Sequence, residues 1–363
     1  MFSHIQKMDK VLAGAAILLA AFGIVELVAM AYGGRISATQ EYKQIIALGI
    51  GVIAMTFMSF LDYRVFKNNS YAVVLLYVAA VFFLGILLLV GHQARGLTGA
   101  FKIGEFAFAP VEMIKIVVAL LLAKYFSVRH VEIYRWFHVI ISFIYVAIPA
   151  GLVLLQPDLG SALVLLGLWI GILFFARISK KQVALLLVTG LLFTGVSWVY
   201  LMKDYQKERI ATFVNPYNDP QGVGYNAIQS MIAVGSGGMF GKGLGYGSQV
   251  QLGFLPEAHT DFMFASIAEE FGFVGILIIF VLLVTIFWRI TRIALDAENN
   301  FARLFCAAMI ILIAVEFIIN MGMNVGIMPV IGIPFPFLSY GGSSVLMLFI
   351  GLGIVQSIKV RSA

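Results

Sequence analysis

The stretch Leu255–Phe262, with the sequence LPEAHTDF, brings the titratable side chains of Glu257, His259 and Asp261 close together just before a long apolar run. A carboxylate in such a place can take a proton from a reacting group, and a neighbouring Glu or His can orient a substrate or bind a metal ion. Each residue also has a structural interpretation. An Asp at the start of a helix often only complements the helix dipole, and a His at a membrane surface often only forms interfacial hydrogen bonds.

The composition places these residues in an integral membrane protein. Hydrophobic residues make up 61% of the 363 positions and charged residues only 12%, which is far from the composition of a soluble domain. The sole cysteine, Cys306, lies in an apolar run, so no internal disulfide can form. We predict a single polytopic domain over residues 1–363.

Ten apolar runs separated by polar breaks have about the length needed to cross a bilayer roughly 30 Å thick. Because every backbone group in lipid needs an internal partner, and no alternation of period two is present, we predict helices rather than barrel strands. The predicted fold is an all-α polytopic membrane protein with about ten transmembrane helices. The runs are Val11–Ala31, Gln44–Leu61, Tyr71–Val90, Pro110–Phe126, Phe137–Leu155, Ser161–Ala176, Val183–Leu201, Phe262–Ile290, Phe301–Met323 and Leu338–Ile354.

Lys and Arg are unevenly distributed over the connections between these runs. Most of them fall on the side that carries the N-terminus, which makes that side cytoplasmic. With an even number of spans, both termini are then expected in the cytoplasm. The opposite side carries one large extracytoplasmic loop, residues 202–260, between the seventh and eighth helices. The net charge of +6 follows mainly from this bias, so it gives little reason to expect nucleic-acid binding.

The large loop has a sequence typical of ordered structure. NPYNDPQGVGYN predicts successive turns, and YNAIQSMIAV predicts a short amphipathic helix at the membrane interface. The glycine-rich GSGGMFGKGLGYG lacks the spacing of a nucleotide-binding phosphate loop. We therefore expect its glycines to allow tight packing and to leave backbone N–H groups free to meet anions.

Seven charged residues lie in or at the edges of the predicted spans, where each costs on the order of 2.5–3.5 kcal/mol at the bilayer centre. For Glu26 and Glu316 the simpler interpretation is a hydrogen bond that bridges two helices. At least one of Glu269 and Glu270 is expected to serve packing or a polar network, because adjacent residues cannot share a helix face. The full set is Glu26, Glu112, Lys115, Asp158, Glu269, Glu270 and Glu316.

Glu112 and Lys115 are three residues apart in the helix that begins at Pro110, so their side chains are neighbours. They form either a structural salt bridge or the lining of a cavity in which the ammonium meets an anionic ligand. Asp158 lies in the tight turn QPDLGSA between two spans, where an Asp is commonly structural. Because Asp158 and Asp261 both lie at outward ends of spans, the two carboxylates can converge on one cavity.

Four segments stand out when the chain is taken as a whole: QPDLGSA, YQKERIATFVNPYNDPQGVGYNAIQSMIAVGSGGMFGKG, LPEAHTDFMFASIAEEFG and GIMPVIGIPFPFLSYGGSS. In order and wording they resemble the motifs of the SEDS family (shape, elongation, division and sporulation), and QPDLG and GKG resemble those of its RodA-type members. The resemblance implies a ten-helix peptidoglycan glycosyltransferase of the bacterial cytoplasmic membrane, acting in cell-wall elongation and cell-shape control.

Such an enzyme polymerises lipid II at the outer face of the membrane, transferring a lipid-diphosphate-linked disaccharide to a sugar 4-hydroxyl. The resemblance implies binding of the undecaprenyl-diphosphate-linked glycan as well. It also implies a class B penicillin-binding protein, a transpeptidase, as partner, together with other cell-elongation machinery.

This reaction needs a carboxylate to take the hydroxyl proton, positive charge beside the leaving diphosphate and an apolar groove for the lipid. We assign Asp261 as the general base, and Asp158 as a cavity residue that can bind a metal ion. A divalent cation, Mg²⁺ or Mn²⁺, is expected from the resemblance without assigned ligands. Solvated surface charge is the alternative for Lys242. The predicted substrate- and diphosphate-binding residues are Arg95, Glu112, Lys115, Arg209, Lys242, Glu257 and His259.

The chain departs from the family pattern at two motifs. Family members usually have an Arg-Trp pair where Gly96 follows Arg95 here, and APVE at 109–112 stands in for Gln-Pro-Ser-Glu. Two other functions stay open on the sequence alone. One is a flippase or transporter of a lipid-linked cell-wall precursor, which would use a midplane site. The other is a noncatalytic scaffold for cell-wall enzymes.

Overall fold

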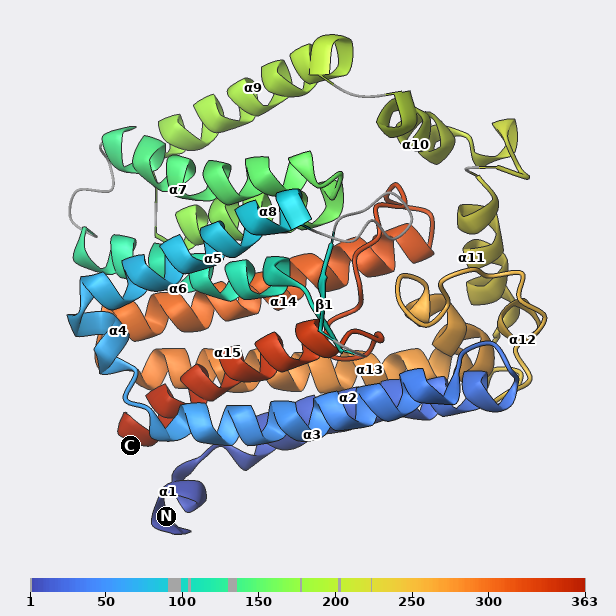
Figure 1. Cartoon of the computed structure of the whole chain (residues 1–363), viewed down its shortest axis with the longest axis horizontal. Coiled ribbons are helices and arrows are strands. Elements are labelled where there is room, and N and C mark those ends of the chain that lie inside the picture. The colour runs from blue at the N-terminus through green and yellow to red at the C-terminus, as the bar shows by residue number, and fades with distance from the viewer. Residues whose placement is uncertain are drawn as a thin grey trace.

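The computed structural model of the chain describes residues 2–90, 99–103, 106–129, 136–176, 178–201, 204–222 and 224–362. Its long helices form one bundle, with the N- and C-termini at the same end (Figure 1). Helices α10 (Asp204–Val214), α11 (Tyr225–Ser236) and α12 (Ser248–Gln251) lie at the opposite end. We call these the terminal end and the loop end of the bundle.

Within the described part of the chain, ten long helices take the places of the ten predicted runs. Seven of them are long and apolar enough to cross a membrane, and α8 is a shorter apolar helix. The all-α membrane fold is thereby confirmed, whereas ten remains a predicted number of spans. The long helices are α2 (Lys10–Tyr32), α3 (Ala38–Phe60), α5 (Ser70–Val90), α6 (Pro110–Val128), α7 (Trp136–Leu155), α8 (Leu159–Phe175), α9 (Lys180–Val196), α13 (Met263–Asp296), α14 (Asn300–Asn324) and α15 (Gly342–Arg361).

Several helix starts follow from local sequence. Asp9 caps α2 by accepting a hydrogen bond from the Leu12 N–H at 2.9 Å, and Asn299 caps α14 in the same way through the Ala302 N–H at 3.0 Å. Pro110 occupies the first position of α6, where its missing N–H costs nothing. Asp158 caps α8 through the Ser161 N–H at 2.9 Å, so the capping side chain is Asp158 rather than Ser161.

The short elements lie mainly in the connections. A two-stranded antiparallel hairpin, which the sequence analysis missed, precedes α6 and pairs Phe101 with Phe108. The loop of residues 202–260 contains the predicted helix α11 and also a polar helix, α10, that was not predicted. The bounds are α1 (Phe2–Lys7), α4 (Arg64–Asn68), β1 (Phe101–Ile103), β2 (Phe106–Phe108), η1 (Ser197–Leu201), α10 (Asp204–Val214), η2 (Pro216–Asn218), α11 (Tyr225–Ser236) and α12 (Ser248–Gln251).

Helix α13 is interrupted at Gly272, whose backbone has φ 64° and ψ −160°. The glycine-rich loop supplies hydrogen bonds that the helix loses there. The N–H groups of Lys242 and Gly243 donate to the carbonyls of Glu269 and Glu270, while those of Phe273 and Val274 donate to loop carbonyls. Tight packing of these glycines is confirmed. The N–H groups of Lys242 and Gly243 are not free, because helix carbonyls accept them, and those of Gly245 and Gly247 donate to the Glu270 carboxylate.

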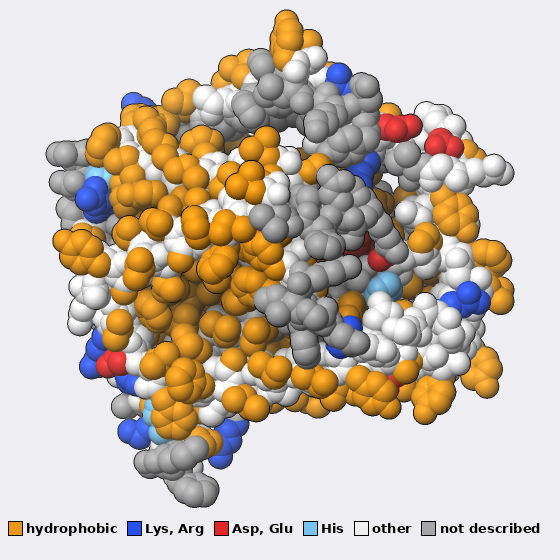
Figure 2. Space-filling model, in the orientation of Figure 1, with side chains coloured by type: hydrophobic (Ala, Val, Ile, Leu, Met, Phe, Trp, Pro, Cys, Tyr) orange, Lys and Arg blue, Asp and Glu red, His pale blue; other side chains and the backbone are white. Residues whose placement is uncertain are grey.

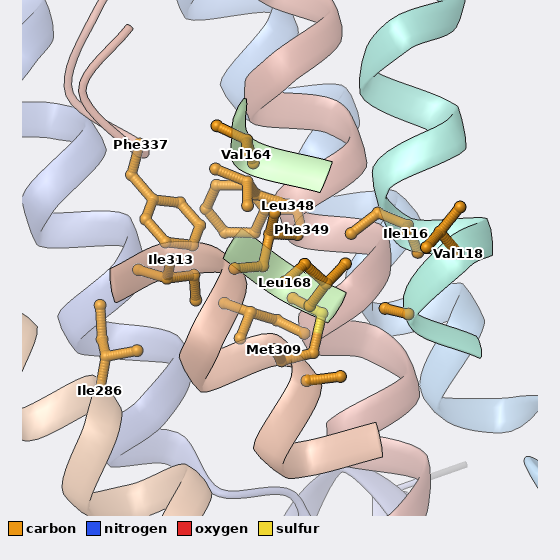
Figure 3. Packing of buried hydrophobic residues seen from close by; sticks show 14 of the residues in the cluster. Ile116, Val118, Val164, Leu168, Ile286, Met309, Ile313, Phe337, Leu348 and Phe349 are labelled. Atoms are coloured by element: carbon orange, nitrogen blue, oxygen red, sulfur yellow. The ribbon is translucent and has the colours of Figure 1, made fainter. Parts of the chain in front are cut away.

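Apolar side chains fill the space between the helices. Figure 3 shows Met309 and Ile313 of α14 beside Leu168 of α8 and Phe349 of α15. In Figure 2 hydrophobic side chains also cover most of the described surface over the long helices, as expected for a protein whose outside contacts lipid.

Candidate active site

Asp261 lies in a series of turns that leads into α13. The helix begins at Met263, so Asp261 precedes it and the predicted position in the first helical turn is wrong. The side chain is half-buried. Glu257, at φ 53°, starts the final turn, and its carbonyl accepts hydrogen bonds from the N–H groups of Thr260 at 3.1 Å and Phe262 at 3.2 Å.

Two asparagines of α14 hold the backbone of this turn. The side-chain amides of Asn320 and Asn324 each donate to the carbonyl of Asp261 at 3.0 Å, and both residues are fully buried. Neither residue was predicted from the sequence. The available signal was a pair of polar residues four positions apart, and so on one face, in an otherwise apolar helix.

The segment Ile331–Ile333 lies beside Asp261 and beside Gly160, two residues after Asp158. A Cβ atom added to Gly332 would lie 3.3 Å from Oδ2 of Asp261. Gly160 packs so closely against the same segment that an added Cβ would lie 2.9 Å from the carbonyl oxygen of Ile331. The first turn of α8, which Asp158 caps, therefore lies beside the same segment as the carboxylate of Asp261. Convergence of the two carboxylates on one cavity stays a prediction.

A largely apolar cavity of about 470 Å³ lies next to Asp261. Thr260, the preceding residue, is part of its wall, and so is Glu112 at the start of α6. Its volume is within the range of ligand pockets, about 300–1,000 Å³. The remaining lining comes from α3, the hairpin and its flanking residues, the segment before α15 and the start of α15, namely Lys43, Ala47, Ile50, Ala100, Ala107, Phe108, Ala109, Pro334, Tyr340, Gly341, Gly342, Ser343, Ser344 and Leu346.

Glu112 and Lys115 form the predicted pair, and a third residue joins them. The Lys115 ammonium donates to Glu112 Oε1 and to Glu316 Oε1, both at 2.8 Å. Lys115 and Glu316 are buried. The pair therefore links α6 to α14, which is the predicted helix-bridging role of Glu316. Contact between the ammonium and an anionic ligand remains a prediction.

His259 and its neighbours tie the turn to the start of α15. The Tyr340 N–H donates to the His259 carbonyl at 2.9 Å, and the two rings lie 5.8 Å apart. The imidazole Nε2 is 3.4 Å from the amide nitrogen of Gln40. Ser339 Oγ donates to the Thr260 carbonyl at 2.6 Å. These contacts agree with the structural interpretation of His259, while substrate binding by His259 and Glu257 stays a prediction.

The predicted cations occupy different surroundings. Arg209 of α10 lines a cavity of about 130 Å³ together with Met328, Pro329 and Val330, directly before Ile331–Ile333. Lys242 forms an ion pair with the buried Glu269 at 2.7 Å. Arg95 lies outside the residues that the structure describes. Diphosphate binding by all three stays a prediction.

Both glutamates near the start of α13 serve the glycine-rich loop. Glu269 accepts hydrogen bonds from the backbone N–H groups of Gln249 and Val250, in addition to its ion pair with Lys242. Glu270 accepts from the N–H of Gly245 at 2.7 Å. Glu26 of α2 bonds to Ser266 of α13. The predicted structural use of these carboxylates is confirmed.

The donor set can be compared with the expected divalent cation. Among the described residues, no cluster of three or more His, Cys, Asp or Glu side chains could enclose a metal ion. Mg²⁺ is commonly held by one or two carboxylates together with substrate phosphate oxygens. The half-buried carboxylate of Asp158 fits a site of this kind, in which one protein carboxylate binds the ion and the substrate diphosphate supplies further ligands.

Known proteins share the sequence and the fold of this chain. The family model for FtsW/RodA/SpoVE, described as cell cycle protein, matches residues 9–363. The chain is 36% identical over 345 residues to peptidoglycan glycosyltransferase MrdB of Escherichia coli strain K12, covering 95% of this chain and 92% of that protein.

Two solved structures resemble the bundle closely. One, described as "Structural coordination of polymerization and crosslinking by a peptidoglycan synthase complex", has a TM-score of 0.82 and 29% identity, with 98% of both chains covered. The other is the Rod shape determining protein RodA of Thermus thermophilus, with a TM-score of 0.71, 28% identity and coverage of 97% of this chain and 96% of that one.

Proposed function

This chain belongs to the FtsW/RodA/SpoVE family of cell cycle proteins, and we infer that it is a peptidoglycan glycosyltransferase that polymerises glycan strands from lipid II. It is an integral membrane protein. One structural observation supports the mechanism most directly. The half-buried Asp261 follows Thr260, which lines the apolar cavity between α3, α6 and α15.

The proton of the acceptor hydroxyl goes to Asp261. The 4-hydroxyl oxygen of one sugar attacks the anomeric carbon of a lipid-linked sugar, and the bond from that carbon to the diphosphate oxygen breaks. The electron pair leaves with the lipid diphosphate, while the Asp261 carboxylate takes the hydroxyl proton. Since the amides of α14 fix the backbone of Asp261, the carboxylate starts from a defined position.

Positive charge for the leaving diphosphate comes from cations at the loop end. Arg209 is the described cation that we favour, because its cavity adjoins the segment that also contacts Asp261. A guanidinium can donate two parallel hydrogen bonds to phosphate oxygens. Arg95 and Lys242 keep their proposed roles, and Lys242 would then divide its donors between the diphosphate and Glu269.

The apolar cavity is the proposed place for the lipid end of a substrate. Its walls carry Ala47, Ile50, Phe108 and Leu346, which can contact hydrocarbon. Thr260 and Glu112 also line it, and they can meet the first polar groups of the substrate. A ligand lying there would place its polar end beside the turn that carries Asp261.

The cofactor that we propose is Mg²⁺ or Mn²⁺. Asp158 would hold the ion, with diphosphate oxygens as further ligands. When bound, the ion would offset the negative charge of the diphosphate. Asp261 would still accept the proton, Arg209 would still bind the diphosphate, and the apolar cavity would still hold the lipid end of the substrate.

The proposed orientation puts the loop end outside and both termini in the cytoplasm. This follows from the excess of Lys and Arg in the connections at the terminal end. The solved peptidoglycan synthase complex coordinates polymerization and crosslinking. We propose that this chain likewise works beside a class B penicillin-binding transpeptidase.

The test uses the purified full-length chain, alone and with its transpeptidase partner, supplied with lipid II and Mg²⁺. Wild type should form glycan polymer. Asp261→Ala and Asp261→Asn should lose at least about 100-fold in rate, the usual contribution of a general base. Asp296→Asn is the matched control, because Asp296 ends the same helix at the terminal end, where it pairs with Lys359 at 3.6 Å.

Polymerisation at the wild-type rate by Asp261→Ala would disprove the base assignment. Movement of lipid II between leaflets by a folded complex that forms no polymer would instead favour a carrier. Thermal unfolding in detergent establishes that each variant is folded before its rate is compared.

A further inference from the structure

The carbonyl of Asp261 and the N–H of Ala265 are not paired with each other as a continuing helix would pair them. Instead, the side-chain amide of Asn324 lies between them. Its Nδ2 donates to the Asp261 carbonyl at 3.0 Å, and its Oδ1 accepts from the Ala265 N–H at 3.1 Å. The first backbone bond of this region within α13 then runs from Ser266 to Phe262 at 3.0 Å. Asn324 thus keeps Asp261 outside the helix.

Asn320, one turn earlier on the same face of α14, joins two chain segments. Its Nδ2 donates to the Asp261 carbonyl at 3.0 Å and to the Ile333 carbonyl at 2.7 Å. Ile333 directly follows Gly332, where an added Cβ would lie 3.3 Å from the Asp261 carboxylate. One amide therefore fixes both the residue that carries the carboxylate and the segment that faces it.

The two amides are occupied by these contacts and by a hydrogen bond from Asn324 Nδ2 to the Asn320 carbonyl at 2.8 Å. Both residues have 0% exposure, and a buried amide without partners would cost on the order of 1–3 kcal/mol. Ser230 of α11 adds a hydrogen bond to the Asn324 carbonyl at 2.9 Å. An apolar residue would pack at these positions without any need for partners, so their polarity has a use beyond packing.

We propose that Asn320 and Asn324 are positioning residues for Asp261, acting through its backbone carbonyl: Asn324 holds Asp261 out of α13 and Asn320 sets its distance from Ile331–Ile333. The proposal rests on the function proposed for Asp261. Neither asparagine touches substrate. Without Asn324, α13 can extend by one turn toward the loop end and carry the Asp261 carboxylate away from its present direction.

The experiment compares Asn324→Leu and Asn320→Leu with wild type in the polymerisation assay, using full-length protein and equal amounts of folded sample. We expect kcat to fall by about 10- to 100-fold, as for a displacement of about 1 Å. The KM for lipid II should stay within about twofold, because the lipid and diphosphate contacts lie elsewhere. Asn324→Ser and Asn320→Ser are the second pair, in case the leucine variants fail to fold.

Two readouts separate positioning from a loss of stability. The midpoint of the acid limb of the pH–rate profile should move, since the surroundings of the carboxylate change. Backbone hydrogen exchange over residues 255–262 should become faster. Asn299→Ala is the control, because Asn299 caps the opposite end of α14; it should lower stability while leaving the midpoint and the exchange in this turn unchanged.

Wild-type kcat and pH profile in folded Asn324 and Asn320 variants would overturn the proposal. A loss of rate with an unmoved pH midpoint and unchanged exchange over residues 255–262 would also overturn it, as that result indicates a structural role only. Asp261→Ala is measured in parallel. Full activity of that variant would refute the base assignment, whereas the exchange experiment would still test whether the asparagines hold the turn.

Discussion

Replacement of Gly272 by Ala should destabilise the protein strongly, although the change adds a single methyl group to a helix. Gly272 interrupts α13 at φ 64° and ψ −160°, a region of backbone conformation that is essentially restricted to glycine. The glycine-rich loop enters at this interruption. Four backbone hydrogen bonds between the loop and the helix depend on it, two on each side of Gly272.

The expected loss of stability in Gly272→Ala has two causes. Holding a non-glycine residue in such a conformation costs about 1–3 kcal/mol. In addition, a Cβ atom at position 272 would lie 2.8 Å from the carbonyl oxygen of Met239 and closer still to the Gly241 nitrogen. These are backbone atoms, which cannot rotate away as a side chain can. We therefore expect a loss of about 3 kcal/mol or more, which corresponds to a fall in Tm on the order of 5 °C.

The assay is thermal unfolding of purified protein in detergent, with polymer formation measured on the same samples. Gly14→Ala is the matched control, because Gly14 lies inside α2 and an added Cβ would meet nothing within 4 Å. That variant should be as stable as wild type or slightly more stable, by up to about 1 kcal/mol. Equal Tm values for Gly272→Ala and Gly14→Ala would refute the interruption of α13 as described.

Two further predictions follow from the loop end. Glu269→Ala should lower the free energy of unfolding by about 2–4 kcal/mol, because the N–H groups of Gln249 and Val250 and the ammonium of Lys242 lose their bonds to Glu269. Glu269→Gln should lower it less, and equal Tm values for the two variants would contradict this prediction. Removal of divalent cations with EDTA should stop polymerisation, and Mg²⁺ or Mn²⁺ should restore it. Since the described residues contain no enclosed metal cluster, EDTA should leave the Tm of the protein without lipid II unchanged. A large fall in Tm would instead indicate a structural metal ion.

The helical fold could be predicted because lipid imposes it on each segment separately. A run such as Tyr71–Val90 needs only its own backbone hydrogen bonds, so composition and length suffice. The cap of α8 is also local, since Asp158 bonds three residues ahead, although no capping role was predicted for Asp158. The position of Asp261 before α13 could not be read in this way. It depends on Asn320 and Asn324, which lie 59 and 63 positions away along the chain.

Other features were not predicted because they also lack a local signal in the sequence. Helix α10 is short and polar, so it lacks the apolar run by which the other helices were found. The partner of Lys115 on α14 is 201 positions away, whereas Glu112, three positions away, was found from spacing alone. In the interruption of α13, only the glycine of EEFGF is local. The loop that fits into it begins more than 30 residues earlier.

At two places where the helical hydrogen-bond pattern of α13 is broken, groups from elsewhere in the chain replace the missing partners. At Gly272 the N–H and carbonyl groups released by the helix are paired with the glycine-rich loop. At the start of α13 the carbonyl of Asp261 and the N–H of Ala265 are paired with the amide of Asn324. Non-helical backbone at membrane depth persists only where protein replaces the missing partners.

This requirement has a consequence for catalysis. A carboxylate on a regular helix could be placed only in steps of the helix repeat. On a turn held by side-chain amides, its position is set by residues of another helix, and those residues can be altered without touching the substrate. The proposed base should therefore depend on the amides of α14 as well as on the identity of residue 261. A chain with Asp261 intact and these amides removed would keep the right chemical group at the wrong place.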